Sequence, residues 1–330
     1  MKDIQLFGLG NGLVDIQYEV EESELAELGL KKGEMRLVES DKQRALLEKY
    51  SHRKFNRCSG GAAANTIICF SQLGGKAAYS TVLGKDEFGQ FYANEFIELG
   101  IELKAEMLDN YPTGTCFVFI TPDSERTMHT SLGATAFFGK HNIDETIISR
   151  SQWIYAEGYK FTAQSSTEAL FYSVELAKKH GTKVSLTFSD VFIIDSFREN
   201  LQKVVNQSDL VFCNENEALC YTGKQNVEDA VEALSRECPN VVVTLGGNGS
   251  IVKWEGKIYR IPSYPARPVD TTGAGDCFAG GFMYGIITTG NPVIAGHIAS
   301  AVGARVVSQM GARISGDIKE LRDEILSKVK

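Results

Sequence analysis

Residues 269–276, Val-Asp-Thr-Thr-Gly-Ala-Gly-Asp, combine residue types and spacing that suit the binding of phosphate. Gly273 and Gly275 let the backbone turn sharply and approach a ligand closely. A long apolar run follows and predicts a buried helix, so the amides of Ala274, Gly275 and Asp276 would lie at its positive N-terminal end. Backbone amides in such a place bind phosphate, or a negative charge that develops during a reaction.

Asp276 would place its carboxylate beside these amides. The amides are expected to stabilise the anion, which makes the carboxylate a weak base. A weak base suits phosphoryl transfer, because this reaction depends mainly on positioning the acceptor and the phosphate. We therefore predict that Asp276 accepts the proton of an acceptor hydroxyl group. The alternative is a helix cap with glycines in a tight turn, which is a common local structure.

The segments around this motif alternate between strand-like and helix-like patterns, which predicts an α/β fold with a mostly parallel central sheet and helices on both faces. Asp86 is expected to cap one helix, because its carboxylate can accept backbone hydrogen bonds at a helix start. The predicted strands span residues 4–9, 77–83, 153–156, 183–188, 209–213 and 241–245. The predicted helices span residues 62–73, 86–99, 165–180, 192–205, 227–238 and 277–287.

Two stretches, residues 12–59 and 102–131, break this alternation and carry strand-like pieces separated by polar turns. The second stretch contains a predicted hairpin, with strands at residues 115–120 and 126–130 and a Thr-Pro-Asp-Ser turn between them. The two stretches are expected to form one small β-sheet, hinged on the α/β body as a lid over the acceptor site. The α/β core domain, which carries the phosphate-binding motif, would then consist of residues 1–11, 60–101 and 132–330.

The composition disfavours several classes of protein. The chain has 330 residues, 43% of them hydrophobic, and a formal net charge of −8, which disfavours a binder of nucleic acid or of anionic membranes. It has no apolar stretch long enough to span a membrane and no signal peptide, so a cytoplasmic protein is expected. The seven cysteines show no C-x-x-C spacing, so neither a disulfide framework nor a zinc site is indicated.

Two motifs far apart in the chain resemble the signatures of a known family. The first comprises G-G-A-A-A-N-T at residues 60–66 and V-L-G-K-D-E-F-G at residues 82–89, and the second is D-T-T-G-A-G-D-C-F-A-G-G-F at residues 270–282. In this order they resemble the ribokinase-like (PfkB) carbohydrate and nucleoside kinases, and the resemblance covers essentially the whole chain. It implies ATP-dependent transfer of the γ-phosphate to a hydroxyl group of a small acceptor, with ATP and Mg²⁺ as cofactors.

The resemblance implies an acceptor pocket. Asn11 and Asp15 match residues of the family's pocket, where the carboxylate holds sugar hydroxyls. Gly60 and Gly61 match pocket glycines whose amides reach a bound hydroxyl, and Asn65 offers both a donor and an acceptor. Without the resemblance, Asp15 would be interpreted as a turn or edge-strand aspartate, and Asn65 as a buried asparagine in the first turn of a helix.

The resemblance also implies a nucleotide side. Asn214 and Glu217 resemble the N-x-x-E element of the family, which organises Mg²⁺ and phosphate mostly through water. Taken alone, they predict a helix N-cap followed by an acidic first turn. The motif T-x-G-x-x-G at residues 244–249 resembles a nucleotide-binding loop, although its Asn-Gly pair also predicts a hairpin turn. The residues expected at the nucleotide are Thr244, Gly246, Gly249, Thr272, His297 and Ser300.

Two further features follow from the same resemblance. Asp270 and Gly311, together with Thr272, lie where many members bind a monovalent cation, so K⁺ is a further expected cofactor. Arg126, in the predicted hairpin, resembles the lid arginine of adenosine kinases, which is positioned to meet the transferred phosphate. The alternative is a solvated arginine on the surface of the hairpin.

The acceptor follows only from overall similarity, which is greatest to bacterial adenosine-kinase-like members of the family. The expected acceptor is the 5′-hydroxyl of adenosine or a related nucleoside, with Phe137, Phe138 and Phe161 as candidates for stacking against a base. Residues 62–64 are alanines, where better-studied adenosine kinases have polar residues. A sugar kinase of the ribokinase or fructokinase type is therefore the alternative.

Two other classes of function are alternatives to a kinase. A dinucleotide-binding oxidoreductase is disfavoured, because the glycines at residues 8–12 have the spacing G-x-G-x-G rather than G-x-G-x-x-G. A non-catalytic protein that binds a nucleotide or metabolite is a second alternative, which the intact Asp276 disfavours. The expected partner is a small-molecule acceptor, with neither nucleic acid nor membrane, and the chain is a monomer or a homodimer.

Overall fold

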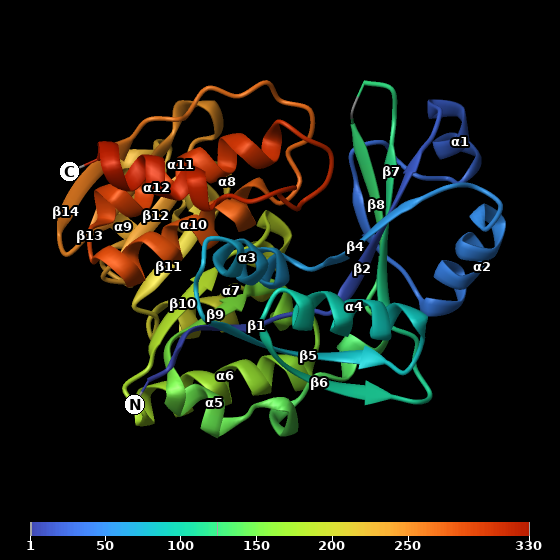
Figure 1. Cartoon of the computed structure of the whole chain (residues 1–330), viewed down its shortest axis with the longest axis horizontal. Helices are drawn as coiled ribbons and strands as arrows, with labels where there is room; N and C mark the ends of the chain where they lie inside the picture. Colours follow the sequence, from blue (N-terminus) through green and yellow to red (C-terminus); the bar gives the residue numbers. More distant parts are fainter. Residues whose placement is uncertain (1, 124, 330) are drawn as a thin grey trace.

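The chain folds into two β-sheets that stand beside one another, as the computed structural model describes for residues 2–123 and 125–329 (Figure 1). A nine-stranded sheet carries most of the helices, and a five-stranded sheet stands next to it with two short helices of its own. Met1, and Ser124 in the predicted hairpin turn, lie outside the described residues. The predicted α/β fold with an additional small sheet is confirmed.

The large sheet is parallel except at one edge. Its strand order is β14-β13-β12-β11-β10-β9-β1-β5-β6, and only the pairs β12–β13 and β13–β14 are antiparallel. Buried, nearly continuous apolar strands are typical of parallel sheets, because helices cover both faces. The strands are β1 (Ile4–Leu9), β5 (Ala77–Gly84), β6 (Glu102–Leu108), β9 (Ser151–Glu157), β10 (Lys183–Thr187), β11 (Leu210–Asn214), β12 (Val241–Thr244), β13 (Ser250–Trp254) and β14 (Lys257–Ile261).

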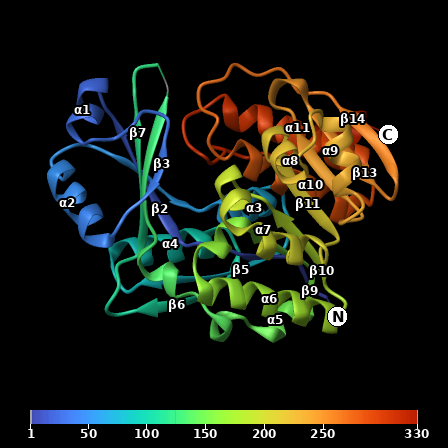
Figure 2. The ribbon, with the colours of Figure 1, turned by 180° about the vertical axis from the view of Figure 1, so that it is seen from behind.

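Helices cover the two faces of the large sheet, and alternate side chains of each strand enter one of two hydrophobic clusters. On β9, Tyr155 belongs to the cluster shared with α3, α10 and α11, whereas Ile154 belongs to the cluster shared with α6, α7 and α9. Figure 2 shows α6 and α7 from behind, beside β9 and β10. The helices are α3 (Ala62–Gln72), α4 (Glu87–Glu98), α5 (Glu145–Arg150), α6 (Gln164–Lys179), α7 (Val191–Val205), α8 (Glu215–Thr222), α9 (Val227–Leu234), α10 (Ala274–Thr289), α11 (Pro292–Val307) and α12 (Lys319–Lys328).

Local signals in the sequence set several helix boundaries. The Asp86 carboxylate accepts a hydrogen bond from the Gly89 amide at 2.8 Å, so the predicted N-cap of α4 is confirmed.

Within the described ranges, no helix combines the length and the apolar character needed to cross a bilayer.

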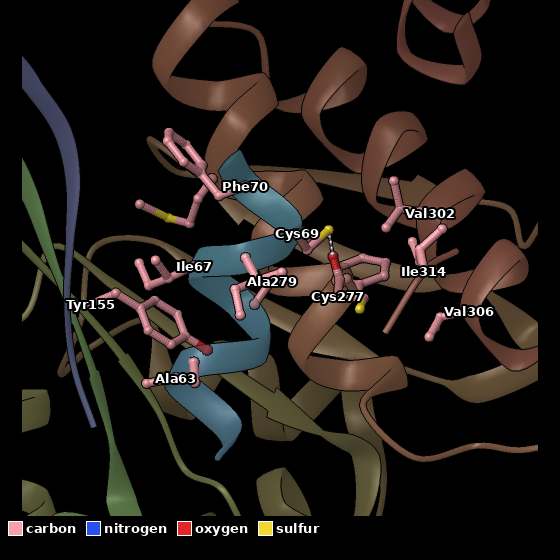
Figure 3. Packing of buried hydrophobic residues seen from close by; sticks show 14 of the residues in the cluster. Ala63, Ile67, Cys69, Phe70, Tyr155, Cys277, Ala279, Val302, Val306 and Ile314 are labelled. Atoms are coloured by element: carbon pink, nitrogen blue, oxygen red, sulfur yellow. Dashed lines mark hydrogen bonds between the residues drawn. The ribbon is translucent and has the colours of Figure 1, made fainter. Parts of the chain in front are cut away.

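Helices α3 and α10 pack against each other in the first of the two clusters (Figure 3). Ile67 and Ala279 are buried in their contact, and the thiol of Cys69 donates to the backbone oxygen of Cys277 at 3.4 Å. The first turns of the two helices carry the polar residues that the sequence singled out. The packing therefore fixes these two helix starts relative to each other.

The small sheet has the strand order β3-β8-β7-β2-β4. Along β2, Val14, Ile16 and Tyr18 belong to a cluster that includes side chains of α1 and α2, whereas Asp15 lies on the opposite face, toward the large sheet. The antiparallel pairing of β7 with β8 confirms the predicted hairpin. The elements are β2 (Leu13–Glu19), α1 (Glu22–Glu27), β3 (Met35–Leu37), α2 (Ser40–Tyr50), β4 (Asn56–Gly60), β7 (Gly114–Ile120) and β8 (Arg126–Ser131).

One boundary of the small sheet differs from the prediction. The sequence assigns residues 102–131 to the lid, but β6 pairs in parallel with β5 and forms one edge of the large sheet. Side chains along β6 alternate between exposed and half-buried, as expected for an edge strand with one solvated face. Because of this alternation, the segment resembles part of a separate sheet. The second stretch that contributes to the small sheet begins after β6.

The connection into α10 also differs from the prediction. The sequence places the glycine-rich motif where a strand becomes a helix, but residues 262–273 form a long loop between β14 and α10. Pro262, Pro265 and Pro268 interrupt this stretch, and a proline has no amide with which to continue a strand ladder. The loop carries the motif from an edge of the large sheet to the start of α10.

Candidate active site

Two cavities of about 500 Å³ each meet at the start of α10. The inner cavity lies between the small sheet and the carboxyl ends of β1 and β9, where the strand order of the large sheet changes direction. Ligands of α/β proteins usually bind at such a point. The outer cavity lies between the β12–β13 turn and α11. Thr271 lines both cavities, with Asp276 on the inner side and Gly275 on the outer side.

A larger hollow, of about 1030 Å³, lies beside α2 and β8 of the small sheet. It is lined by residues such as Leu46, Tyr111 and His129. Of the residues for which the sequence predicts a role, it contains only Phe137, one of the stacking candidates, and none of the predicted catalytic residues. We therefore place the candidate site where the inner and outer cavities meet.

Gly273 shapes the start of α10. Its φ of 69° lies in the left-handed region, and a Cβ there would lie 2.7 Å from the Cβ of Ala312, so both the backbone and the packing require glycine. The Ala274 amide donates to the Thr271 carbonyl at 3.2 Å, so this amide does not face a ligand as predicted. The amides of Gly275 and Asp276 find no acceptor among the described residues and remain as donors at the positive helix end.

The Asp276 carboxylate faces the inner cavity. Its Oδ2 accepts a hydrogen bond from Nδ2 of Asn65 at 3.0 Å, and the Thr66 hydroxyl donates to its backbone oxygen at 3.0 Å. Burial raises the pKa of Asp276 to about 7, and the carboxylates of Glu157 and Asp15 add to the rise. The sequence predicts a stabilised anion and hence a low pKa, but the pKa of Asp276 is raised, because the carboxylate is buried away from water and several acidic groups face it. A base with a pKa near 7 is well matched to neutral pH.

Asp15 projects from β2 into the same cavity, between Cys58 on β4 and Cys116 on β7. Asp15 is only 8% exposed. Burial raises the pKa of Asp15 to about 6, although Arg313 and Arg126 act to lower it. The carboxylate accepts no hydrogen bond from the part of the chain that the structure describes. Such a carboxylate is suited to hold hydroxyl groups of a ligand, because they would supply the missing donors.

The structure brings most of the predicted acceptor residues together. Gly60 is the exception, because it packs behind Asp15, where a Cβ would lie 2.4 Å from the carboxylate oxygen. The residues from this prediction that line the inner cavity are Asn11, Asp15, Gly61, Asn65, Arg126, Gly273 and Asp276.

Two buried residues that the sequence did not single out lie beneath Asn11. Glu157 accepts the Asn11 amide at 2.9 Å with one carboxylate oxygen and the Ala63 amide at 2.7 Å with the other. Nζ of Lys160 donates to Oδ1 of Asn11 at 2.9 Å and lies 4.0 Å from the ring centroid of Phe138. Oδ1 of Asn11 is therefore occupied. Lys160 was missed because a lysine beside aromatic residues usually extends to solvent.

The prediction of which aromatic residues stack against a base is wrong, because none of the three lines the inner cavity. Phe138 and Phe161 are buried in the hydrophobic cluster behind the large sheet, and Phe137 is 43% exposed outside the inner cavity. Tyr159 and Phe192 line the inner cavity instead. Both follow strand ends of the large sheet, which is a tertiary arrangement that local sequence does not reveal.

Arg126 reaches from β8 into the inner cavity and forms an ion pair with Asp270. The side chains of Arg126 and Asp270 are 9% and 1% exposed. Nε and Nη1 of Arg126 have no hydrogen-bond partner among the described residues, and burial lowers the pKa of Arg126 to about 10. Buried donors without partners are costly, and a guanidinium fork matches the oxygens of a phosphate group.

Asp270 is held by protein donors on both carboxylate oxygens. The amide of Thr272 donates to Oδ1 at 2.8 Å, and the amide of Gly311 donates to Oδ2 at 2.6 Å. Together with the ion pair to Arg126, these bonds join the loop before α10, the segment after α11 and the small sheet. The monovalent cation at Asp270 and Gly311 stays a prediction, and a cation there would share the carboxylate with Arg126.

The residues predicted for the nucleotide do not all lie in one place. Thr244, Gly246, Gly249 and Ser300 line the outer cavity. His297 does not line it but lies behind Tyr264, whose hydroxyl is 3.3 Å from Nδ1 of His297. The other predicted residues lie elsewhere, with Thr272 on the inner cavity and both Asn214 and Glu217 outside the linings of the two cavities.

Asn214 and Glu217 form a capping box at the start of α8. The Asn214 side chain accepts the Glu217 amide at 2.9 Å, and Glu217 accepts both the backbone and the side-chain amide of Asn214. Burial raises the pKa of Glu217 to about 7. Both carboxylate oxygens are thus engaged within the box, so this residue would act on a metal ion only through water.

The raised pKa values predict how the stability of the unliganded protein depends on pH. Asp15, Asp276 and Glu217 keep protons in the folded chain at pH values where the unfolded chain has released them. The resulting stabilisation is complete below about pH 4 and is lost as pH rises through 6 to 7. The melting temperature is therefore expected to fall by several degrees between pH 5 and pH 8, apart from the effects of other groups.

Differential scanning calorimetry at matched ionic strength would measure this dependence. Comparison with Asp276→Asn isolates the contribution of Asp276, because the variant should show a shallower fall over the same pH range. Equal slopes for the two proteins would contradict the raised pKa.

Comparisons with known proteins agree with this geometry. The profile of the pfkB family carbohydrate kinases matches residues 33–319. The adenosine kinase of Saccharomyces cerevisiae is 28% identical over 302 residues, covering 84% of this chain and 87% of that protein. The structure of the adenosine kinase from Sinorhizobium meliloti has a TM-score of 0.90 at 30% identity and covers 97% and 99% of the two chains. A probable sugar kinase from Rhizobium etli has a TM-score of 0.91 at 29% identity, with 98% and 99% covered.

The matched profile spans most of the chain and includes both motifs from which the sequence suggested a phosphotransferase. The neighbouring structures extend over nearly the whole fold, including the small sheet. The chain belongs to the pfkB family of carbohydrate kinases, enzymes that transfer phosphate to hydroxyl groups of sugars or nucleosides.

Proposed function

We propose that this kinase transfers the γ-phosphate of ATP to a primary hydroxyl of a small acceptor, the 5′-hydroxyl of adenosine or a related nucleoside. The observation that carries the proposal is the meeting of two cavities at the start of α10. The free amides of Gly275 and Asp276 lie at the junction, and the Asp276 carboxylate faces the inner cavity. An acceptor in the inner cavity and a nucleotide in the outer cavity would face each other across these amides.

In the proposed reaction the acceptor hydroxyl lies beside Asp276. Its oxygen forms a bond to the γ-phosphorus while the bond from that phosphorus to the bridging oxygen of ATP breaks, and ADP leaves. The hydroxyl proton passes to the Asp276 carboxylate. The amides of Gly275 and Asp276 stabilise the negative charge of the transferred group, and Arg126 adds a guanidinium from the small sheet. Asp15 holds further hydroxyls of the acceptor.

Mg²⁺ is the proposed metal cofactor, because it neutralises phosphate charge in this type of reaction. Across residues 2–123 and 125–329, no group of three or more His, Cys, Asp or Glu side chains is arranged to bind a metal ion. This fits a cation that is held mainly by nucleotide phosphates and water, with the buried Glu217 contributing through the water shell.

A nucleoside acceptor is supported by the composition of the inner cavity. Tyr159, Phe192 and Met35 give it an apolar wall against which a base can pack, and Asn11 and Asp15 give it a polar end for a ribose. Two of the similar proteins described above are adenosine kinases. A small lid sheet over this cavity would exclude water while the phosphate is transferred.

A sugar acceptor of the ribokinase or fructokinase type is the second candidate. Ala62 lines the inner cavity at the start of α3 and offers no polar atom of its side chain to a base. A cavity that offers no polar contact to a base at this point also suits a sugar, whose polar groups are hydroxyls. The similar structure from Rhizobium etli, a probable sugar kinase, is consistent with this candidate.

An ADP-release assay with a panel of acceptors tests the proposal. The purified protein with ATP and Mg²⁺ is expected to release ADP when adenosine is added, with AMP as the second product. Phosphorylation of ribose or fructose without phosphorylation of adenosine would replace the nucleoside by a sugar. Binding of ATP and adenosine without ADP release from any acceptor would instead indicate a non-catalytic binding protein.

A further inference from the structure

We infer that Arg313 is a positioning residue that orients the side-chain amide of Asn65 toward the catalytic Asp276. The inference rests on the proposed function, because it takes Asp276 as the base. Arg313 lies in the segment between α11 and α12, belongs to none of the sequence motifs, and does not line the inner cavity. Its effect on the reaction would therefore pass through Asn65.

The guanidinium of Arg313 is held by a side chain of α4 and by the side chain and backbone of a residue of β4. Its side chain is 14% exposed, and Nη1 forms an ion pair with Glu95 of α4 at 3.1 Å. Nη2 donates to the hydroxyl of Ser59 on β4 at 2.8 Å and to the Ser59 backbone oxygen. Glu95 in turn accepts the Ser59 amide at 3.0 Å. These contacts fix the plane of the guanidinium. The N–H bond of Nε therefore points in a single direction.

The N–H bond of Nε points toward the side chain of Asn65. Nε of Arg313 donates to Oδ1 of Asn65 at 3.3 Å, and Nδ2 of Asn65 donates to Oδ2 of Asp276 at 3.0 Å. The oxygen of an asparagine side chain cannot donate, so the bond from Arg313 selects the amide orientation whose NH₂ group faces Asp276. A reversed amide would place an oxygen against the carboxylate and a donor against the guanidinium.

The orientation of Asn65 matters because acidic groups dominate the other surroundings of Asp276. Asn65 is the side chain that donates a hydrogen bond to this carboxylate, and such a bond favours the anion. Loss of the bond would leave Asp276 with a pKa raised further. The ionisable groups that act on Asp276 or face it from packed elements are Glu157, Asp15, Glu217, Tyr155, Tyr159, Cys277, Arg126 and Arg313.

The test is the pH profile of kcat/KM for Arg313→Met, with adenosine and ATP as substrates. The acid limb of the wild-type profile reports the ionisation of Asp276 in the free enzyme. In the variant, this limb is expected to move to higher pH by about one unit, which lowers kcat/KM about tenfold on the acid side. At high pH, where Asp276 is ionised in both proteins, most of the activity should return.

Two variants separate this role from simpler ones. Arg313→Lys keeps the positive charge but lacks the guanidinium fork, so it should shift the acid limb nearly as far as Arg313→Met. Arg322→Met removes another partly buried arginine, one that donates to Leu73 and Tyr284 far from the base, and should leave the limb in place. Thermal unfolding of each variant shows how much of any activity loss is due to lost stability.

A double-mutant cycle with Asn65→Ala identifies the route of the effect. If Arg313 acts through Asn65, adding Arg313→Met to the Asn65→Ala background leaves the acid limb unchanged. An additional shift in that background would overturn the inference, as would a wild-type profile for Arg313→Lys or a loss of activity that is uniform across pH. If Asp276→Asn retained full activity, the base itself would be misassigned and the proposed function would fail first.

Discussion

Replacing Asp276 by asparagine is expected to lower kcat by about 10²–10⁴-fold, whereas the Kd for adenosine and the Kd for ATP should change little. Asparagine keeps the size of the side chain and cannot accept the hydroxyl proton. It also keeps an oxygen that can accept the hydrogen bond from Asn65. ADP release at saturating substrates measures kcat, and calorimetric titration of each ligand measures the Kd.

The same variant makes an opposite prediction for stability. Because the pKa of Asp276 is raised in the folded protein, its ionisation lowers the stability progressively between about pH 4 and pH 7, by on the order of a few kcal/mol in total. Asp276→Asn removes this charge and should unfold at a higher temperature than the wild type at pH 8, with a clearly smaller difference at pH 5 and little difference below pH 4. An inactive variant that is less stable at pH 8 would show that structural damage, and not the missing base, caused the inactivity.

Gly61→Ala is expected to lower the free energy of unfolding by about 3 kcal/mol or more and to abolish binding of the acceptor. Gly61 precedes α3 with a φ of 104° and a ψ of 136°, a conformation that residues with a Cβ rarely adopt. A Cβ there would also lie 2.3 Å from the backbone oxygen of Asn11. Relief of this clash would separate two segments that line the inner cavity. Urea unfolding and titration with adenosine measure the two effects.

Gly290→Ala is the matched control for Gly61→Ala. Gly290 ends α10 with a φ of 67°, and a Cβ there would contact nothing within 4 Å. Its substitution carries only the cost of the left-handed backbone, about 1–2 kcal/mol, and should leave the acceptor Kd unchanged. Equal losses of stability in the two variants would contradict the role of the contact between Gly61 and Asn11.

The architecture of the large sheet could be predicted from the sequence because its signals are local. The alternating apolar segments and the Asp86 cap each depend on neighbouring residues, as does the Thr-Pro-Asp-Ser signal that predicted the β7–β8 hairpin of the small sheet. The edge strand β6 was misassigned for the same reason, because an amphipathic strand shows its own pattern but not the sheet that it joins. The prolines within residues 262–273 are also a local signal, and they indicate the loop that precedes α10.

The chemistry of the site could be predicted only where a motif carries it. The segment around Asp276 marks a helix start with phosphate-binding character. The pKa of Asp276, however, is raised mainly by burial, and then by Glu157 and Asp15, which the fold brings in from other strands. Lys160 and Arg313 each orient a side-chain amide of the inner cavity, and neither belongs to a motif. Their roles depend on contacts between residues far apart in the chain.

The position of β1 inside the large sheet has a consequence for protein synthesis. β1 pairs with β5 on one side and β9 on the other, and a ribosome makes both partners after β1. This apolar strand therefore waits with both edges unpaired, a condition that promotes aggregation. Asp276 and Arg313 are made later still, so the inner cavity gains the start of α10 only near the end of synthesis. Chaperones that shield unpaired strands should thus affect the yield of this enzyme more than its final activity.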